Sequence, residues 1–192
     1  MFIKDWKKEL FTVPNILSLF RLLLIPVYVS IYLNAVTEWA HFLAACILGI
    51  SCLTDLLDGR IARHFNMVTN IGKVLDPLAD KMTQLTLTVC LSIKFPALRS
   101  VLLLFVIKEA FQVSVACMML NRGKVLPGSL IAGKVCTTVL FSGLILLVLL
   151  PTPVPWVVNT IAILDVIFLS YEFISYGLAF FGKKSKLQDL EP

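Results

Sequence analysis

The chain has 192 residues, of which 58% are hydrophobic and 15% charged, and its formal net charge at pH 7 is +5. Its long apolar runs each approach the roughly 20 residues that cross a bilayer as a helix. Because these runs are continuous rather than alternating, they favour helices over a β-barrel. We predict an all-α, polytopic membrane protein with a single domain over residues 1–192. The expected spans are residues 15–33, 38–58, 72–93, 97–121, 129–150 and 156–181.

Basic residues gather on alternate connections of the predicted bundle, and this bias predicts which side is cytoplasmic. They lie before the first span and in the second connection, the fourth connection and the tail at residues 183–192: Lys4, Lys7, Lys8, Arg60, Arg63, Lys73, Arg122, Lys124, Lys183, Lys184 and Lys186. Both termini are therefore expected in the cytoplasm. The positive charge fits this topology and anionic lipid better than it fits nucleic acid.

Residues 1–12 place apolar side chains on one stripe and lysines on the rest. This pattern predicts a short interfacial amphipathic helix, and a flexible basic anchor is the alternative. The following apolar run is long and contains Arg21, so we expect no cleavable signal peptide. The five cysteines lie in apolar segments at spacings that fit neither a disulfide framework nor a zinc site.

The first span contains three polar residues at intervals of three, Asn15, Ser18 and Arg21, which share one helix face. Arg21 lies deep enough to need a partner, and that partner is either an aspartate or a phosphate. The alternative is that its side chain reaches back to the cytoplasmic headgroups. We expect this face to belong to a substrate site.

Four aspartates interrupt the second and third apolar runs. Asp55 and Asp58 are three residues apart, and Asp76 and Asp80 are four apart. Each pair therefore lies on one helix face with Cβ atoms roughly 5–6 Å apart. Two such faces turned toward each other form a cage of carboxylate oxygens, which suits hard divalent cations such as Mg²⁺ and their phosphate ligands. Asp80 is the expected general base, because it is the last acid in the array.

Other residues around the aspartates favour a diphosphate substrate. Gly59 allows close approach of a ligand to the backbone. Arg63, one turn beyond, has a guanidinium group that suits bidentate contact with phosphate. Pro77 directly follows Asp76 and can kink the third span.

The later spans carry further charged residues. Because the adjacent Lys108 and Glu109 do not share a helix face, we expect one to face the polar cavity and the other to pair elsewhere; a structural ion pair of Lys108 to another helix is the alternative. Glu172 is expected to reach the cavity or its basic rim. Asp165 lies deeper and has no assigned partner. The fifth span opens with polar residues expected at the depth of the aspartates: Ser129, Lys134 and Thr137.

The segment from Asp55 to Asp80 resembles the signature of the CDP-alcohol phosphatidyltransferases, D-x2-D-G-x2-A-R-x8-G-x3-D-x3-D, at every fixed position. The resemblance implies that the four aspartates hold two ions of Mg²⁺ or Mn²⁺ and that Asp80 also acts as the base. It implies contacts with the CDP-linked lipid, CDP-diacylglycerol, and we assign these to seven residues: Asn15, Ser18, Arg21, Gly59, Ala62, Arg63 and Gly72. It also implies a homodimer with a cytoplasmic cavity open to lipid.

The acceptor alcohol is a finer question. The opening Pro14-Asn15 to Arg21 and the run Asp76-Pro77 to Lys81 are similar to bacterial phosphatidylglycerolphosphate synthases, which act on glycerol 3-phosphate, and cardiolipin synthases share both features. The first group usually has Arg-Glu where this chain has Lys108-Glu109, and a second lysine in its fifth span. We expect the acceptor to be glycerol 3-phosphate, bound by Lys108, Ser129, Lys134 and Thr137. Phosphatidylglycerol, a diester with one charge, is the alternative.

Two other classes of protein also place acids in helical bundles. An aspartate-motif prenyltransferase would lack the Gly-x-x-Ala-Arg insertion, and a cation transporter would spread its acids along a path through the bilayer. The acids do not alternate as an EF-hand loop requires. The compact chain favours a bacterial plasma membrane.

Overall fold

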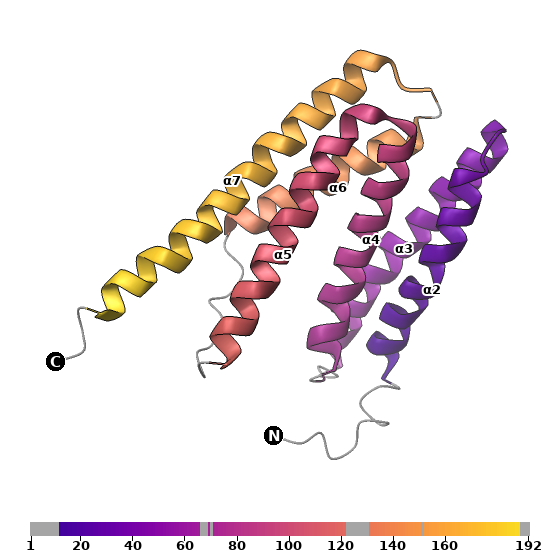
Figure 1. Cartoon of the computed structure of the whole chain (residues 1–192). Coiled ribbons are helices and arrows are strands. Elements are labelled where there is room, and N and C mark those ends of the chain that lie inside the picture. The colour runs from indigo at the N-terminus through magenta and orange to yellow at the C-terminus, as the bar shows by residue number, and fades with distance from the viewer. Residues whose placement is uncertain (1–11, 66–68, 70, 122–130, 151, 189–192) are drawn as a thin grey trace. The chain divides into compact units, whose positions relative to one another are not determined.

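The chain is helical throughout the part that the structure, a computed structural model, describes: residues 12–65, 69, 71–121, 131–150 and 152–188. Within these ranges there are six α-helices, one short 3-10 helix (η1) and no strand (Figure 1), which confirms the all-α prediction. The helices are α2 (Val13–Leu33), α3 (Glu38–His64), α4 (Gly72–Lys94), η1 (Pro96–Leu98), α5 (Arg99–Asn121), α6 (Ile131–Leu149) and α7 (Pro155–Gln188). The interfacial helix was predicted over residues 1–12, of which residues 1–11 lie outside the described ranges.

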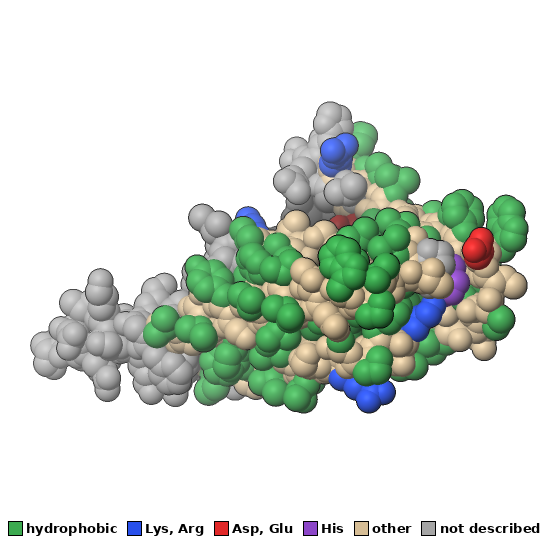
Figure 2. All heavy atoms as spheres, turned by 90° about the horizontal axis from the view of Figure 1, so that it is seen from above, with side chains coloured by type: hydrophobic (Ala, Val, Ile, Leu, Met, Phe, Trp, Pro, Cys, Tyr) green, Lys and Arg blue, Asp and Glu red, His purple; other side chains and the backbone are tan. Residues whose placement is uncertain are grey.

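Three helical segments are long and apolar enough to cross a membrane, Val13–Leu33, Pro96–Met118 and Pro155–Leu178, and a shorter apolar helix covers Gly133–Leu149. Large apolar side chains remain exposed on these segments, among them Leu23 at 69%. Figure 2 shows hydrophobic side chains over much of the face it presents, with few charged ones between them. Such a surface matches the hydrocarbon of a bilayer, and the polytopic membrane character is confirmed.

The chain divides into two compact units, each with its own core. The first comprises Met1–Cys90 with Val148–Pro151, and so contains α2, α3 and most of α4; the second comprises Leu91–Leu147 with Thr152–Pro192. Buried side chains of the first unit include Ala44, Leu48, Ala79 and Leu87, and those of the second include Leu98, Phe105, Leu140, Leu144 and Leu169. The single domain over residues 1–192 stays a prediction.

Helix ends follow local sequence signals. Pro14 lies in the first turn of α2, where a missing N–H costs nothing. Thr37 caps α3, and its hydroxyl accepts the Ala40 N–H at 3.3 Å. The helix α3 ends at His64 rather than near residue 58 as predicted. The motif from Asp55 to Arg63 therefore lies on one continuous helix.

Candidate active site

Helix α2 carries a buried polar stripe in an otherwise apolar sequence. Asn15, Ser18 and Arg21 are only 1%, 0% and 2% exposed. Their spacing puts them on one face of the helix, as the sequence predicts. Polar groups buried this deeply need partners, and the first unit supplies them from α3, α4 and the residue Thr69.

Arg21 links two of the predicted metal ligands. Its Nη1 lies 2.7 Å from Asp55 Oδ1, and the same nitrogen forms an ion pair with Asp80 Oδ1. The side chain of Arg21 is 2% exposed, whereas those of Asp55 and Asp80 are 44% and 47% exposed. The guanidinium therefore lies beneath the two carboxylates, which are open at the surface. Of the expected partners for Arg21, the structure shows an aspartate.

Ser18 connects the same stripe to the third described aspartate. Its Oγ donates to Asp76 Oδ1 at 2.6 Å and lies 3.2 Å from the Pro14 carbonyl oxygen one turn back. Asp55, Asp76 and Asp80, the motif aspartates whose side chains are described, thus each receive a donor from α2. A carboxylate oxygen held by a charged or hydroxyl donor keeps a fixed orientation, which is how ligands of a metal are commonly positioned.

Thr69 joins the beginning of α4 to α2. Its Oγ1 accepts the Gly72 N–H at 2.9 Å and the Asn15 Nδ2 amide at 3.0 Å. A Cβ on Gly72 would lie 2.6 Å from Asn15 Oδ1 and 3.0 Å from Thr69 Oγ1, so a larger residue would displace these hydrogen-bonded side chains. Thr69 was not among the predicted site residues, although a threonine three residues before the start of α4 at Gly72 is a recognisable capping signal.

The aspartates suit a divalent cation by their chemistry. Carboxylate oxygens are the ligands that Mg²⁺ and Mn²⁺ prefer, and two of these carboxylates already converge on one cationic nitrogen of Arg21. Among the described side chains no group of three His, Cys, Asp or Glu is arranged to hold a metal ion. The Asp58 side chain lies outside the described part of the chain, and the four-aspartate site stays a prediction.

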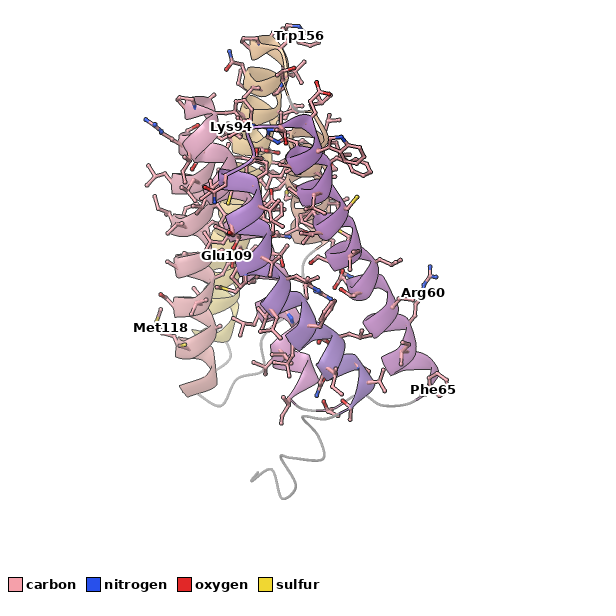
Figure 3. The ribbon with its side chains drawn as sticks, turned by 90° about the vertical axis from the view of Figure 1, so that its right-hand side faces the viewer. Arg60, Phe65, Lys94, Glu109, Met118 and Trp156 are labelled. Carbon is pink, nitrogen blue, oxygen red and sulfur yellow. The ribbon has the colours of Figure 1, made fainter. Side chains whose placement is uncertain are left out.

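Three of the residues that the resemblance assigns to the nucleotide lie near the end of α3. The side chains of Gly59, Ala62 and Arg63 are outside the described part, and their roles stay predictions. Between them, Arg60 is exposed and points away from the neighbouring ribbons (Figure 3). Its position adds positive charge at this end of α3.

The second unit holds a buried charged cluster around Lys108, which is 1% exposed. Its Nζ lies 2.7 Å from Glu109 Oε1 and 3.1 and 3.2 Å from the two Glu172 oxygens, and Gln112 Nε2 donates to Glu172 Oε1 at 3.3 Å. The expectation that Lys108 and Glu109 face different surroundings is wrong for their charged ends, because their long stems bend toward each other. The alternative, an ion pair from Lys108 to another helix, is present between α5 and α7.

The start of α6 borders this cluster. A Cβ on Gly133 would lie 3.2 Å from the Tyr176 hydroxyl and 3.4 Å from Glu172 Oε1. The next residue, Lys134, is exposed, and Thr137 Oγ1 donates to the Gly133 carbonyl at 2.8 Å within the helix. Ser129 lies outside the described residues. The proposed acceptor residues thus include one exposed cation, Lys134, and one buried in ion pairs, Lys108.

Asp165 on α7 is 1% exposed, and within the described part of the chain its Oδ2 has no hydrogen-bond partner. Gly143 on α6 leaves room beside it, since an added Cβ would lie 3.5 Å from Asp165 Oδ1 and 2.9 Å from an Ile161 methyl. A carboxyl group in such a place is costly in its charged form. No role is assigned to it.

Comparison with known proteins agrees with these features. A family model described as CDP-alcohol phosphatidyltransferase matches residues 11–171. The CDP-diacylglycerol--glycerol-3-phosphate 3-phosphatidyltransferase of Escherichia coli strain K12 is 44% identical over 72 residues, which are 38% of this chain and 39% of that protein. A Schizosaccharomyces pombe protein, "Cardiolipin synthase (CMP-forming) / mitochondrial hydrolase fusion protein", is 41% identical over 88 residues, 46% of this chain and 14% of that protein. These matches span well under two thirds of either relative.

Fold and site together define a polytopic, helical membrane protein with an aspartate-lined polar site. Because the family model covers most of its length, the chain belongs to the CDP-alcohol phosphatidyltransferase family. Divalent metal ions are used in this family.

Proposed function

We propose that the chain transfers a phosphatidyl group from CDP-diacylglycerol to the hydroxyl of glycerol 3-phosphate, giving phosphatidylglycerol phosphate and CMP. One observation carries the proposal: the aspartates of the family signature, Asp55 and Asp80, converge on the buried Arg21 from two different helices. The name of the Escherichia coli relative supports the same reaction and the same acceptor.

In the proposed mechanism Asp55, Asp58, Asp76 and Asp80 hold two ions of Mg²⁺ or Mn²⁺. Such ions, held by these residues, would supply positive charge to the diphosphate and to the leaving CMP. The acceptor hydroxyl oxygen bonds to the phosphorus that carries diacylglycerol, and the bond from that phosphorus to CMP breaks. Asp80 takes the proton of the hydroxyl. Its side chain is 47% exposed, so an acceptor can reach it.

The CDP portion is assigned to Gly59, Ala62 and Arg63 of α3, and to Gly72 at the start of α4. Support comes from Gly72, which has no room for a side chain beside Asn15. Arg63 would bind phosphate oxygens through its planar guanidinium group.

The acceptor phosphate is assigned to Lys108, Ser129, Lys134 and Thr137. Support comes from Lys134, which is exposed at the start of α6 and carries the strongly hydrated ammonium that binds phosphate as a point charge.

Phosphatidylglycerol is the second candidate acceptor, which would make the chain a cardiolipin synthase. A specific observation favours it: Lys108 forms ion pairs with Glu109 and Glu172, so its positive charge is largely compensated within the protein. A site with fewer available cations suits a diester with one negative charge better than a phosphate monoester with two. The Schizosaccharomyces pombe relative is named as a cardiolipin synthase fusion protein.

We further propose a homodimer in a bacterial plasma membrane, with the active site and both termini in the cytoplasm. Support for the orientation comes from the distribution of lysine and arginine between alternate connections. Membrane lipid then surrounds the apolar helices and delivers the CDP-linked substrate laterally.

The decisive experiment is CMP release from CDP-diacylglycerol by purified protein with Mg²⁺ or Mn²⁺, each acceptor tested separately. Release with glycerol 3-phosphate alone supports the first candidate. Release with phosphatidylglycerol alone supports the second candidate. If no CMP is released with either of these acceptors, or with serine or inositol phosphate, the proposed activity is contradicted. A reaction containing EDTA tests the metal requirement.

A further inference from the structure

Three polar residues of α2 require an explanation that contact with substrate does not give. Asn15, Ser18 and Arg21 are at most 2% exposed. A bound lipid touches side chains that solvent reaches in its absence, unless the protein rearranges. These three side chains instead donate hydrogen bonds to α4 and to Thr69, and Arg21 also forms an ion pair with Asp55 of α3.

We propose that Arg21 and Ser18 are positioning residues of the metal site, which hold the aspartates from the buried side and do not contact the CDP-linked lipid. This inference rests on the proposed function, because it assumes that the aspartates bind divalent ions. It assigns Arg21 to Asp55 and Asp80, and Ser18 to Asp76.

The geometry of Arg21 carries the first part. A single nitrogen, Nη1, contacts one oxygen of Asp55 and one oxygen of Asp80, so one group sets the separation of a ligand on α3 from a ligand on α4. A guanidinium group carries a positive charge. It therefore offsets part of the repulsion between the carboxylates before an ion arrives. The exposed parts of the two aspartates, 44% and 47% of their side chains, remain accessible from the surface.

Ser18 carries the second part. Its hydroxyl, fully buried, lies 2.6 Å from Asp76 Oδ1, a short distance typical of an O–H donor to a carboxylate. Asp76 begins the Asp-Pro step inside α4, where the proline takes away one backbone N–H. The Ser18 hydroxyl therefore holds the Asp76 carboxylate from α2, whatever Pro77 does to the backbone of α4.

The test measures metal binding without substrate. Mn²⁺ affinity of the purified full-length protein is determined by electron paramagnetic resonance or calorimetry for wild type, Arg21→Gln, Arg21→Lys and Ser18→Ala. Tyr28→Phe is the matched control, since Tyr28 lies on the same helix, is 4% exposed, and its hydroxyl has no partner among the described residues. The Michaelis constant for CDP-diacylglycerol is then measured at saturating Mn²⁺.

Loss of an outer partner of a metal ligand typically weakens metal binding by about 10- to 100-fold, and we expect a loss of this size for Arg21→Gln. Arg21→Lys keeps the charge and should lie between Arg21→Gln and wild type. Ser18→Ala, which removes one neutral donor, should show a smaller loss, and Tyr28→Phe none. The Michaelis constant for CDP-diacylglycerol at saturating Mn²⁺ should not change.

Two results would overturn the inference. Unchanged or tighter Mn²⁺ binding by both Arg21→Gln and Ser18→Ala would show that these residues do not support the metal ligands. If the Arg21 variants raise the Michaelis constant for CDP-diacylglycerol and leave the Mn²⁺ affinity unchanged, Arg21 contacts the lipid directly. If Arg21→Gln does not fold, Arg21→Lys and Ser18→Ala decide. A wild-type protein that binds no Mn²⁺ contradicts the metal part of the proposed function itself, a separate outcome.

Discussion

The buried cluster of Lys108, Glu109 and Glu172 predicts that replacing its lysine lowers the free energy of unfolding more than replacing one of its acids. Lys108, Glu109 and Glu172 together carry a formal charge of −1, and the two carboxylates lie 2.7 and 3.1 Å from the same ammonium nitrogen. Lys108→Met leaves two acids around the position of the lost cation. Removing one partner of a buried pair costs about 3–5 kcal/mol, and we expect this loss of unfolding free energy for Lys108→Met.

Glu172→Gln should cost less. It removes one negative charge and leaves Lys108 beside Glu109, so the cluster becomes neutral, and the loss is that of a charge-assisted hydrogen bond, about 1.5–3 kcal/mol. Lys134→Met is the matched control because Lys134 is exposed on α6; such surface changes usually stay within about 0.5 kcal/mol. Reversible unfolding in mixed detergent micelles measures the stability of all three variants.

A larger loss of unfolding free energy for Glu172→Gln than for Lys108→Met would refute the charge argument. A Lys108→Met variant with wild-type stability and a raised Michaelis constant for the acceptor would show that Lys108 serves the acceptor instead.

Three further predictions concern the aspartate site and two glycines. Asp80→Asn should abolish CMP release while much of the nucleotide binding remains, as measured by turnover and by CDP titration; persisting activity would mean that the base is another group. Gly72→Ala should lose about 1–3 kcal/mol of stability, because its Cβ would lie 2.6 Å from the buried Asn15 Oδ1, whereas Gly49→Ala on α3 meets nothing within 4 Å and should lose none. Gly143→Ala places its Cβ 2.9 Å from an isoleucine methyl of α7 and should also lower the unfolding midpoint; equal midpoints for all three glycine variants would contradict the packing.

Much of the first unit could be predicted because its signals are local. The intervals between Asn15, Ser18 and Arg21 fix a common helix face, and a deep arginine in an apolar helix requires a partner. From the sequence alone, the partner of Arg21 could be an aspartate or a phosphate, and the alternative was that its side chain reaches the headgroups. The choice depends on which helix packs against α2, and that is a property of the tertiary structure.

The features that sequence reasoning missed depend on side-chain length and on backbone ends. Lys108 and Glu109 start on different sides of α5, yet their charged groups meet, because a lysine stem can turn through a wide arc in a buried place. Thr69 precedes α4 in a connection that has little periodicity of its own. The helix α3 continues to His64 because residues 59–64 include good helix formers. These residues are too polar to be counted in a membrane span by hydropathy, so the predicted span ended at residue 58.

The charge balance of the second unit bears on acceptor choice. An acceptor phosphate approaching Lys108 would meet a cluster whose net charge is −1, and the ammonium would have to leave Glu109 and Glu172 in order to bind it. An exposed ammonium such as that of Lys134 has no such competition to overcome within the contacts that the structure describes. Discrimination between one and two negative charges on the acceptor should therefore follow Lys134. Lys134→Gln should raise the Michaelis constant for glycerol 3-phosphate more than that for phosphatidylglycerol, since the monoester phosphate loses the larger Coulomb attraction.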